Sequence, residues 1–271
     1  MRKKLLHGKK ACILAAFLML FMAAGIAEEE RTDASGQWKY VLEDSGATIT
    51  GYVEEPSGDL VIPGDLDEIP VTGIGKEAFS SCFLLTGVTI PDGVTNIGEG
   101  AFKHCYVLSD VSIPQGVSGI GSKAFYNCGD LSGVMIPDSV TSIGDWAFTA
   151  CESLTEITIP DSVTSIGEGA FGSCSGLVSL VIPFGVPAIS NYAFQYSGLL
   201  SLIIPESVTH IGDYAFFMCD SLISVTIPAS VTSIGKGAFI GCEKLTLSVA
   251  KGNYAEQYAQ RNSIPYVFLE E

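Results

Sequence analysis

A unit of 23 residues repeats along most of this 271-residue chain. An Ala-Phe pair marks every copy, and successive pairs lie 23 residues apart except for one interval of 22 residues. The phenylalanines of these pairs are Phe79, Phe102, Phe125, Phe148, Phe171, Phe194, Phe216 and Phe239. A single unit is too short to bury its own apolar residues, whereas stacked units bury them against one another. The period therefore predicts a solenoid.

Each unit reads L-x-x-V-x-I-P-x-x-V-x-x-I-G-x-x-A-F-x-x-C-x-x. Val88 and Ile90 alternate with smaller residues, which is the pattern of a short strand with one buried face. Pro91 ends this strand because proline has no N–H to donate. The spacing of Ala101 and Cys105 predicts a brief helical or 3₁₀ turn. We expect the strands of successive units to pair in parallel, about 4.8 Å apart.

The unit resembles the BspA-type leucine-rich repeat of bacterial surface proteins, from about Leu60 to Val249. It differs from commoner leucine-rich repeats because no asparagine ladder follows the strand. The resemblance implies a curved α/β-type solenoid with a parallel sheet on its concave face and short helical or 3₁₀ turns on its convex side. It also implies adhesion to, or binding of, macromolecules of a host or partner cell.

The two ends of the chain depart from the repeat. Residues 1–27 combine a basic leader with an apolar run, which predicts a secretory signal peptide cleaved after Ala27. A retained membrane anchor is the alternative, but the run is shorter than the about 18–20 residues that span a bilayer. Residues 28–59 are expected to form a linker and a β-hairpin cap with its turn near Asp44.

Residues 60–250 hold about eight repeats, with an insertion of about five residues around Gly64 to Ile69. Residues 251–271 are expected to form a C-terminal cap that contains a helix. Asn253 and Glu256 resemble a capping box at the start of that helix.

The charge of the chain limits its partners. The leader holds five of the 14 basic residues and none of the 30 acidic residues, so the chain without it carries 9 − 30 = −21. Such a charge repels nucleic acid and anionic lipid, so neither is expected as a partner. Rows of carboxylates could hold Ca²⁺, but the sequence lacks a dense D-x-D-x-D loop. We expect no metal and no cofactor.

Seven of the eight cysteines occupy one position of the repeat, namely Cys82, Cys105, Cys128, Cys151, Cys174, Cys219 and Cys242. In an exported protein such cysteines raise the alternative of disulfides. Equivalent side chains of adjacent coils point in parallel, however, so their sulfurs lie near the coil spacing and far beyond the roughly 2.05 Å of a disulfide. We expect buried free thiols.

Catalytic signals are weak. Beyond the leader the chain retains only His104 and His210, and no Ser or Cys outside the repeat accompanies a base. The acidic rows could supply paired carboxylates for glycoside hydrolysis, but their periodic placement is typical of turns. We expect a protein that is not an enzyme.

The repeat is least regular between Pro183 and Phe217. Phe184 replaces an acid, Pro187 a polar residue, Ser190 a glycine and Ser197 a cysteine, and one residue is missing. We expect the missing residue to alter the local curvature and leave a step or groove. Exposed apolar and aromatic side chains are typical of interfaces. The predicted ligand-contact residues are Val181, Phe184, Tyr192, Tyr196, Ile203, Tyr214 and Phe217.

Two alternatives for this region remain open: repeat decay without consequence, or aromatic side chains that repair a packing defect. Trp146 shares the repeat position of Tyr192 and Tyr214 and could extend the same strip. The sequence thus predicts a secreted or cell-surface module, bacterial by its family resemblance, that binds extracellular protein. A glycan-binding module and a passive spacer or assembly scaffold are the alternatives, and the oligomeric state is not determined.

Overall fold

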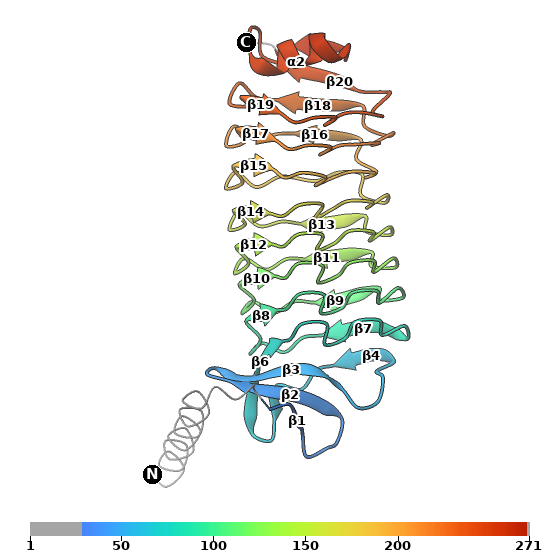
Figure 1. The fold of residues 1–271 in the computed structure, drawn as a ribbon, viewed down its shortest axis with the longest axis vertical. Helices are drawn as coiled ribbons and strands as arrows, with labels where there is room; N and C mark the ends of the chain where they lie inside the picture. Colours follow the sequence, from blue (N-terminus) through green and yellow to red (C-terminus); the bar gives the residue numbers. More distant parts are fainter. Residues whose placement is uncertain (1–28, 270–271) are drawn as a thin grey trace.

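The computed structural model describes residues 29–269, so the predicted signal peptide lies outside the described residues. The chain winds into a stack of coils, with the hairpin strands β2 (Trp38–Glu43) and β3 (Gly46–Tyr52) at one end and the helix α2 (Tyr254–Asn262) at the other (Figure 1). The expected repeat solenoid with parallel sheets is confirmed.

A regular coil has three sides, which the coil that begins at Leu85 illustrates. The long-strand side holds β7 (Leu85–Thr89), and the short-strand side holds β8 (Asn96–Ile97). The third side, which we call the turn side, runs from Gly98 to Cys105. Strands of the same side stack one above another along the solenoid (Figure 1).

The long-strand side carries the strands that the sequence predicted. They pair in parallel one repeat apart, as Val88 does with Val111, in the groups β4–β7–β9, β11–β13 and β16–β18–β20–β21. Beyond β7 the strands are β4 (Gly58–Val61), β9 (Asp110–Ser112), β11 (Gly133–Met135), β13 (Glu156–Thr158), β16 (Ser201–Ile203), β18 (Ser224–Ile227), β20 (Thr246–Val249) and β21 (Tyr266–Phe268).

The short-strand side is a second parallel ladder that the sequence did not predict. Two residues per coil are too few to show the period of two that marks a strand. Its strands are β6 (Ile69–Ile74), β8, β10 (Gly119–Ile120), β12 (Ser142–Ile143), β14 (Ser165–Ile166), β15 (Ala188–Ile189), β17 (His210–Ile211) and β19 (Ser233–Ile234).

The turn side differs from the expected helical or 3₁₀ turn. The amides of Ala101 and Cys105 donate to the carbonyls three residues earlier, at 3.3 Å each. Gly100 (φ 61°) and His104 (φ 63°), however, have left-handed backbones, which interrupt any helix. Each coil repeats this pair of left-handed residues, so the turn side consists of linked turns, joined between coils by bonds such as Phe102 N–H to Ala124 O (2.8 Å).

The repeated phenylalanines form a continuous column in the core. Each is buried, and neighbouring rings stack with centroids 5.1–6.0 Å apart. Trp38 and Tyr52 cover the Phe79 end of the column, and Tyr258 covers the Phe239 end. The two caps therefore close an apolar column that would otherwise be exposed at both ends.

The seven cysteines of the repeat are free, and all but the half-buried Cys242 are fully buried, as predicted. Each thiol from Cys105 onward donates to the carbonyl oxygen of the Phe in the preceding coil, for example Cys105 to Phe79 at 3.1 Å. Burial raises the pKa of Cys128 and of Cys174 to about 12. These thiols therefore act as protonated donors inside the core.

The N-terminal cap is the expected hairpin, built from β2 (Trp38–Glu43) and β3 (Gly46–Tyr52) with β1 (Arg31–Thr32) beside β2. β3 pairs in parallel with β6 and so joins the cap to the short-strand side. In the insertion, β5 (Asp65–Leu66) pairs antiparallel with the start of β6.

The C-terminal cap contains the helix α2 (Tyr254–Asn262). Asn253 Oδ1 accepts the amide of Glu256 at 2.8 Å, as in a capping box. Glu256 Oε2 accepts the amide of Gly252 (2.6 Å) rather than that of Asn253, which differs from the predicted box by one residue. β21 then adds a final parallel strand beside β20.

Candidate functional site

Between the coils that contain β14 and β15, the stack of residues 29–269 is interrupted on both strand sides, whereas the break between β9 and β11 affects the long-strand side alone. Elsewhere on the short-strand side of residues 29–269, neighbouring strands pair in parallel, but β14 and β15 do not. On the long-strand side, no backbone hydrogen bond joins Ser179–Val181 to either neighbouring coil, and these residues form no strand. We call this boundary the seam (Figure 1).

Pro187 removes one of the hydrogen bonds that join regular coils. In the coil before the seam, the amide of Thr164 donates to the carbonyl of Thr141 at 3.0 Å. In the coil after it, the amide of Thr209 donates to the carbonyl of Pro187 at 2.9 Å. Proline has no N–H, so Pro187 cannot donate to Thr164 in the same way.

Ser190 keeps the two coils from approaching as closely as their neighbours do. The repeat has glycine at this position, and a Cβ added at Gly167 would lie 2.5 Å from the Asp145 nitrogen, which is too close for any side chain. Ser190 carries such a Cβ. Its hydroxyl donates to the Ile166 carbonyl at 2.5 Å, whereas Gly167 uses its backbone amide to reach Ile143 at 2.9 Å.

The turn side stays closed across the seam. Amides of Gly169, Phe171 and Ser173 donate to carbonyls of the next coil at 2.9, 2.9 and 2.6 Å. The Phe171 and Phe194 rings are nevertheless 6.0 Å apart, the widest step of the column. The seam is therefore open on the two strand sides and bonded on the third.

The deletion does not itself open the stack. The residue is missing between Ser197 and Leu199, and there the amide of Gly198 donates to the carbonyl of Cys174 across the seam at 3.1 Å. The expected change of curvature at the deletion therefore stays a prediction. On the short-strand side the gap lies earlier in the same coil, at Pro187 and Ser190, where hydrogen-bond donors and close packing are lost.

A small cavity lies at the seam, lined mainly by Ile166, Ile182, Val186, Ile189 and Phe194. Its volume is about 10 Å³, roughly the room of one water molecule. Such an apolar cavity is too small to be a ligand pocket. Any binding in this region must therefore use the outer surface.

The structure divides the seven predicted contact residues between two sides of the coil. Val181 and Ile203 lie on the long-strand side and are 80% and 74% exposed. Phe184 lies three residues after Val181 in the same coil and is 68% exposed. The other four, Tyr192, Tyr196, Tyr214 and Phe217, lie on the turn side.

The turn-side aromatic residues pack mainly against one another. Tyr192 and Tyr214 stack with centroids 5.4 Å apart, and Trp146 extends the stack at 6.1 Å from Tyr192. Phe217 contacts Tyr214 and Tyr196 edge to face, at 5.6 and 5.4 Å. Trp146, Tyr192 and Tyr214 thus cover one another's ring faces and stabilise the turn side, whereas Tyr196 remains 49% exposed.

Three exposed residues that sequence reasoning missed complete a surface on the long-strand side. Val178, Leu200 and Ile223 each follow the buried leucine of the unit and are exposed. Backbone bonds hold them side by side, from Leu200 N–H to Val178 O (3.0 Å) and from Ile223 N–H to Leu200 O (2.8 Å). With Val181 and Ile203 they form what we call the apolar patch.

The signal for these three residues was present in the repeat. The same position holds a polar residue in the other regular coils, namely Thr86, Ser109, Ser132, Thr155 and Thr246. At this repeat position, three successive coils therefore carry an apolar residue where the other coils carry a hydroxyl side chain, and this difference marks the patch in the sequence.

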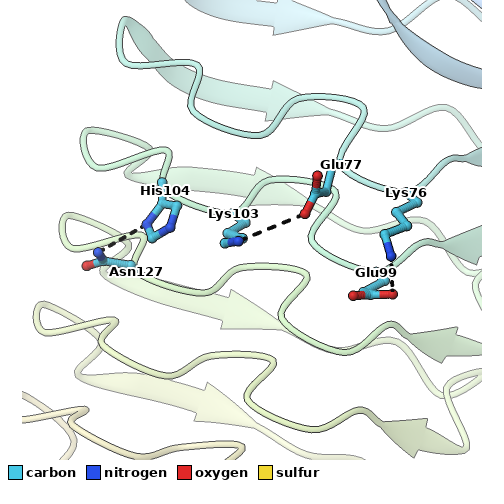
Figure 2. Close-up of polar contacts among 6 residues, drawn as sticks. All are labelled: Lys76, Glu77, Glu99, Lys103, His104 and Asn127. Atoms are coloured by element: carbon cyan, nitrogen blue, oxygen red, sulfur yellow. Dashed lines mark hydrogen bonds and ion pairs between the residues drawn. The ribbon is translucent and has the colours of Figure 1, made fainter.

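The electrostatic surroundings of the patch are mainly acidic, with the exposed Lys244 beside Glu243 in the coil that follows Ile223. Between Lys123 and Lys236 the chain has no lysine or arginine. The same stretch has ten acidic residues, namely Asp130, Asp138, Asp145, Glu152, Glu156, Asp161, Glu168, Glu206, Asp213 and Asp220. Basic side chains that pair with carboxylates lie nearer the N-terminal end, where Lys76 meets Glu99 at 3.0 Å and Lys103 meets Glu77 at 3.9 Å (Figure 2).

His104 lies in the same N-terminal region and faces Asn127, with Nδ1 3.2 Å from the amide nitrogen (Figure 2). Burial lowers its pKa, so the imidazole is neutral at pH 7. Within residues 29–269, no group of three or more His, Cys, Asp or Glu side chains is arranged to hold a metal. No helix in that part of the chain is long and apolar enough to span a membrane.

The coil geometry, with one leucine-led strand per unit, defines a leucine-rich-repeat solenoid. The family described as BspA type leucine rich repeat region matches residues 72–199 and 187–261 in six copies. The match covers well over half of the chain, and the protein belongs to this family.

The chain is similar to several solved structures, of which the first supports the fold. A T. pallidum leucine-rich-repeat protein is 26% identical with a TM-score of 0.64, covering 89% of this chain and 100% of its own. A leucine-rich cell surface protein from Faecalibacterium prausnitzii is 24% identical with a TM-score of 0.47, covering 89% and 99%. A leucine-rich-repeat protein from Bacteroides capillosus is 34% identical with a TM-score of 0.41, covering 45% and 93%. The comparison with curated proteins found no match.

Proposed function

We propose that this protein is a secreted or surface-retained bacterial module that binds extracellular protein without catalysing a reaction. The basic and apolar leader supports export, and the repeat family supports an interaction module. The apolar patch is the observation that carries the proposal, because clustered exposed aliphatic side chains are typical of protein interfaces.

The apolar patch favours protein over glycan. Sugars bind through stacking on exposed aromatic faces and through polar groups, whereas the patch consists of Val, Leu and Ile side chains. In the turn-side aromatic cluster, Trp146, Tyr192 and Tyr214 stack their ring faces on one another. We therefore place the binding surface on the long-strand side, with Val181 and Ile203 at its centre and Phe184 at its margin.

The test is a binding screen of the chain from Glu28 onward against purified extracellular proteins and a glycan array. We expect saturable binding to a protein that falls at least tenfold, or about 1.4 kcal/mol, in a Val181→Asn, Ile203→Asn variant. The matched control, Thr89→Asn with Ser112→Asn, changes exposed residues on the same side and should bind normally.

Two results would contradict the proposal. One is protein binding that persists unchanged in the patch variant, although circular dichroism shows an intact fold. The other is binding to glycans alone, which would favour the turn-side aromatic cluster and the glycan-binding alternative.

A further inference from the structure

The apolar patch and its charged surroundings together constrain the chemistry of a partner. We propose that the patch binds a cationic amphipathic segment of a protein, which places an apolar stripe on the patch and basic side chains above the flanking carboxylates. This inference rests on the proposed function and specifies the class of partner.

The size of the patch suits one short amphipathic element. Neighbouring coils are about 4.8 Å apart, so the three coils of Val178, Leu200 and Ile223 extend about 10 Å along the solenoid. Val181 and Ile203 form a second row, three residues farther along each coil, which adds about 10 Å across it. A helix with its side chains is about 10–12 Å wide, so two to three turns of an amphipathic helix would cover this surface.

Carboxylates border the patch on several sides. Glu156 is exposed in β13, in the coil directly before the patch. In the next two coils, which carry patch residues, Ser179 and Ser201 take the repeat position of Glu156. Glu206 follows the coil segment that holds Ile203, and Asp220 precedes Ile223 by three residues; both are exposed. Basic side chains of a partner would therefore meet carboxylates at the rim while its apolar face covers the centre.

Carboxylates outnumber basic side chains around the patch. The exposed Lys244 lies two residues before Thr246, whose amide donates to the Ile223 carbonyl at 2.8 Å. Within residues 124–235 no lysine or arginine neutralises the ten carboxylates. A surface of one sign attracts oppositely charged partners and repels those of like charge. The charge therefore opposes a second copy of this chain, nucleic acid or an anionic lipid surface, each of which is also negative.

The probe for the test is a synthetic 18-residue helical peptide with leucines on one face and lysines on the other. One comparison peptide replaces every lysine with glutamate, and a second replaces every leucine with serine. Binding is measured by fluorescence anisotropy at about 50 and 300 mM NaCl, because the ionic contribution weakens with salt.

We expect the Lys/Leu peptide to bind, with the Glu/Leu and Lys/Ser peptides at least tenfold weaker. Val181→Asn with Ile203→Asn should weaken the Lys/Leu peptide at least tenfold. The matched control, Val61→Asn with Met135→Asn, removes equally exposed aliphatic side chains from the same side and should leave binding unchanged. Glu156→Gln with Asp220→Asn should weaken binding and reduce its salt dependence.

Several outcomes would overturn the inference, and they separate it from the proposed function. If the Glu/Leu peptide binds as tightly as the Lys/Leu peptide and the patch variant weakens both, the patch binds protein but the cationic class is wrong. Equal Lys/Leu binding to wild type and to the patch variant would mean general charge adsorption. Failure of the Lys/Leu peptide to bind would reject the cationic segment, while the screen of extracellular proteins would still test the proposed function.

Discussion

Seven cysteines occupy one position of this solenoid's repeat, and six of them donate their thiol to a backbone carbonyl. From Cys105 onward each thiol donates to a phenylalanine carbonyl in the preceding coil, at 3.0–3.2 Å. Ser197 takes the same position once, and its hydroxyl contacts the Cys219 sulfur at 3.4 Å. This position of the repeat thus holds a small side chain with a polar hydrogen in each coil.

Burial of these thiols should make the protein less stable at alkaline pH. It raises the pKa of Cys128, Cys151 and Cys174, so the folded chain keeps protons that the unfolded chain releases above about pH 9. The stabilisation that these three protonated thiols give the folded state is fully present below about pH 9. It is lost as pH rises toward 12, by up to about 1.4 kcal/mol per pH unit for each thiol.

Urea unfolding at pH values from about 7.5 to 10.5 measures this effect. A variant with alanine at all three positions lacks the thiols and should show a shallower fall in the free energy of unfolding. Tyrosines titrate in both proteins, so the difference in slope isolates the cysteines. Parallel pH profiles would mean that the buried thiols do not cause the loss.

At the scale of strands and coils, the seam is the main departure from the repeat. Pro187 lacks a donor, Ser190 adds a Cβ where glycine permits close approach, and β14 and β15 remain unpaired. The turn side continues to bond across the same boundary. A few residues that differ from the repeat, such as Pro187 and Ser190, are thus enough to interrupt a strand ladder.

Restoring the repeat at the seam should strengthen the stack. Pro187→Thr with Ser190→Gly supplies the missing amide and removes the obstructing Cβ, and each new backbone bond is worth about 0.5–1.5 kcal/mol. We expect the free energy of unfolding to rise by about 1–3 kcal/mol. Amide exchange at residues 165–167 and 188–190 should slow at the same time.

Gly167→Ala provides the opposite control, because its Cβ would lie 2.5 Å from the Asp145 nitrogen. It should destabilise the protein by about 1–3 kcal/mol, as overpacking does. Unchanged exchange at the seam in the restored variant would show that β14 and β15 are separated by something other than Pro187 and Ser190.

Over the whole molecule, stability is expected to depend on neighbouring coils. Phe148 lies in the middle of the column, 5.3 Å from Phe125 and 5.6 Å from Phe171. Phe239 lies at the last step, between Phe216 and the cap residue Tyr258. A contact network of this kind couples each coil mainly to the two beside it.

Phe148→Ala should therefore lower the free energy of unfolding by about 3–5 kcal/mol, because it leaves a cavity in the middle of the column. Phe239→Ala should mainly loosen the C-terminal coils, which hydrogen exchange would detect at α2 and β20 before the N-terminal coils respond. Equal loss of protection along the entire chain in both variants would argue against a one-dimensional stack.

The sequence by itself determined the repeat, its solenoid class, the column of phenylalanines, the free buried cysteines and the irregular region. The regular features recur at fixed positions of the 23-residue period, so alternation and period carry them directly, and the irregular region is recognised by its departures from them. The same reasoning identified Val181 and Ile203, because an exposed position is recognisable from the strand pattern.

Tertiary structure decided what depends on contacts between coils. The second ladder has only two residues per coil, so its strands leave no alternation in the sequence. The turn side became linked turns because two residues per coil adopt left-handed backbones. On the short-strand side the seam lies at Pro187 and Ser190 rather than at the deletion, because a lost donor and an added Cβ separate the coils while the shortened turn remains hydrogen-bonded. The division of the predicted contact residues between two sides follows from how each coil bends, a three-dimensional property that residue spacing alone does not specify.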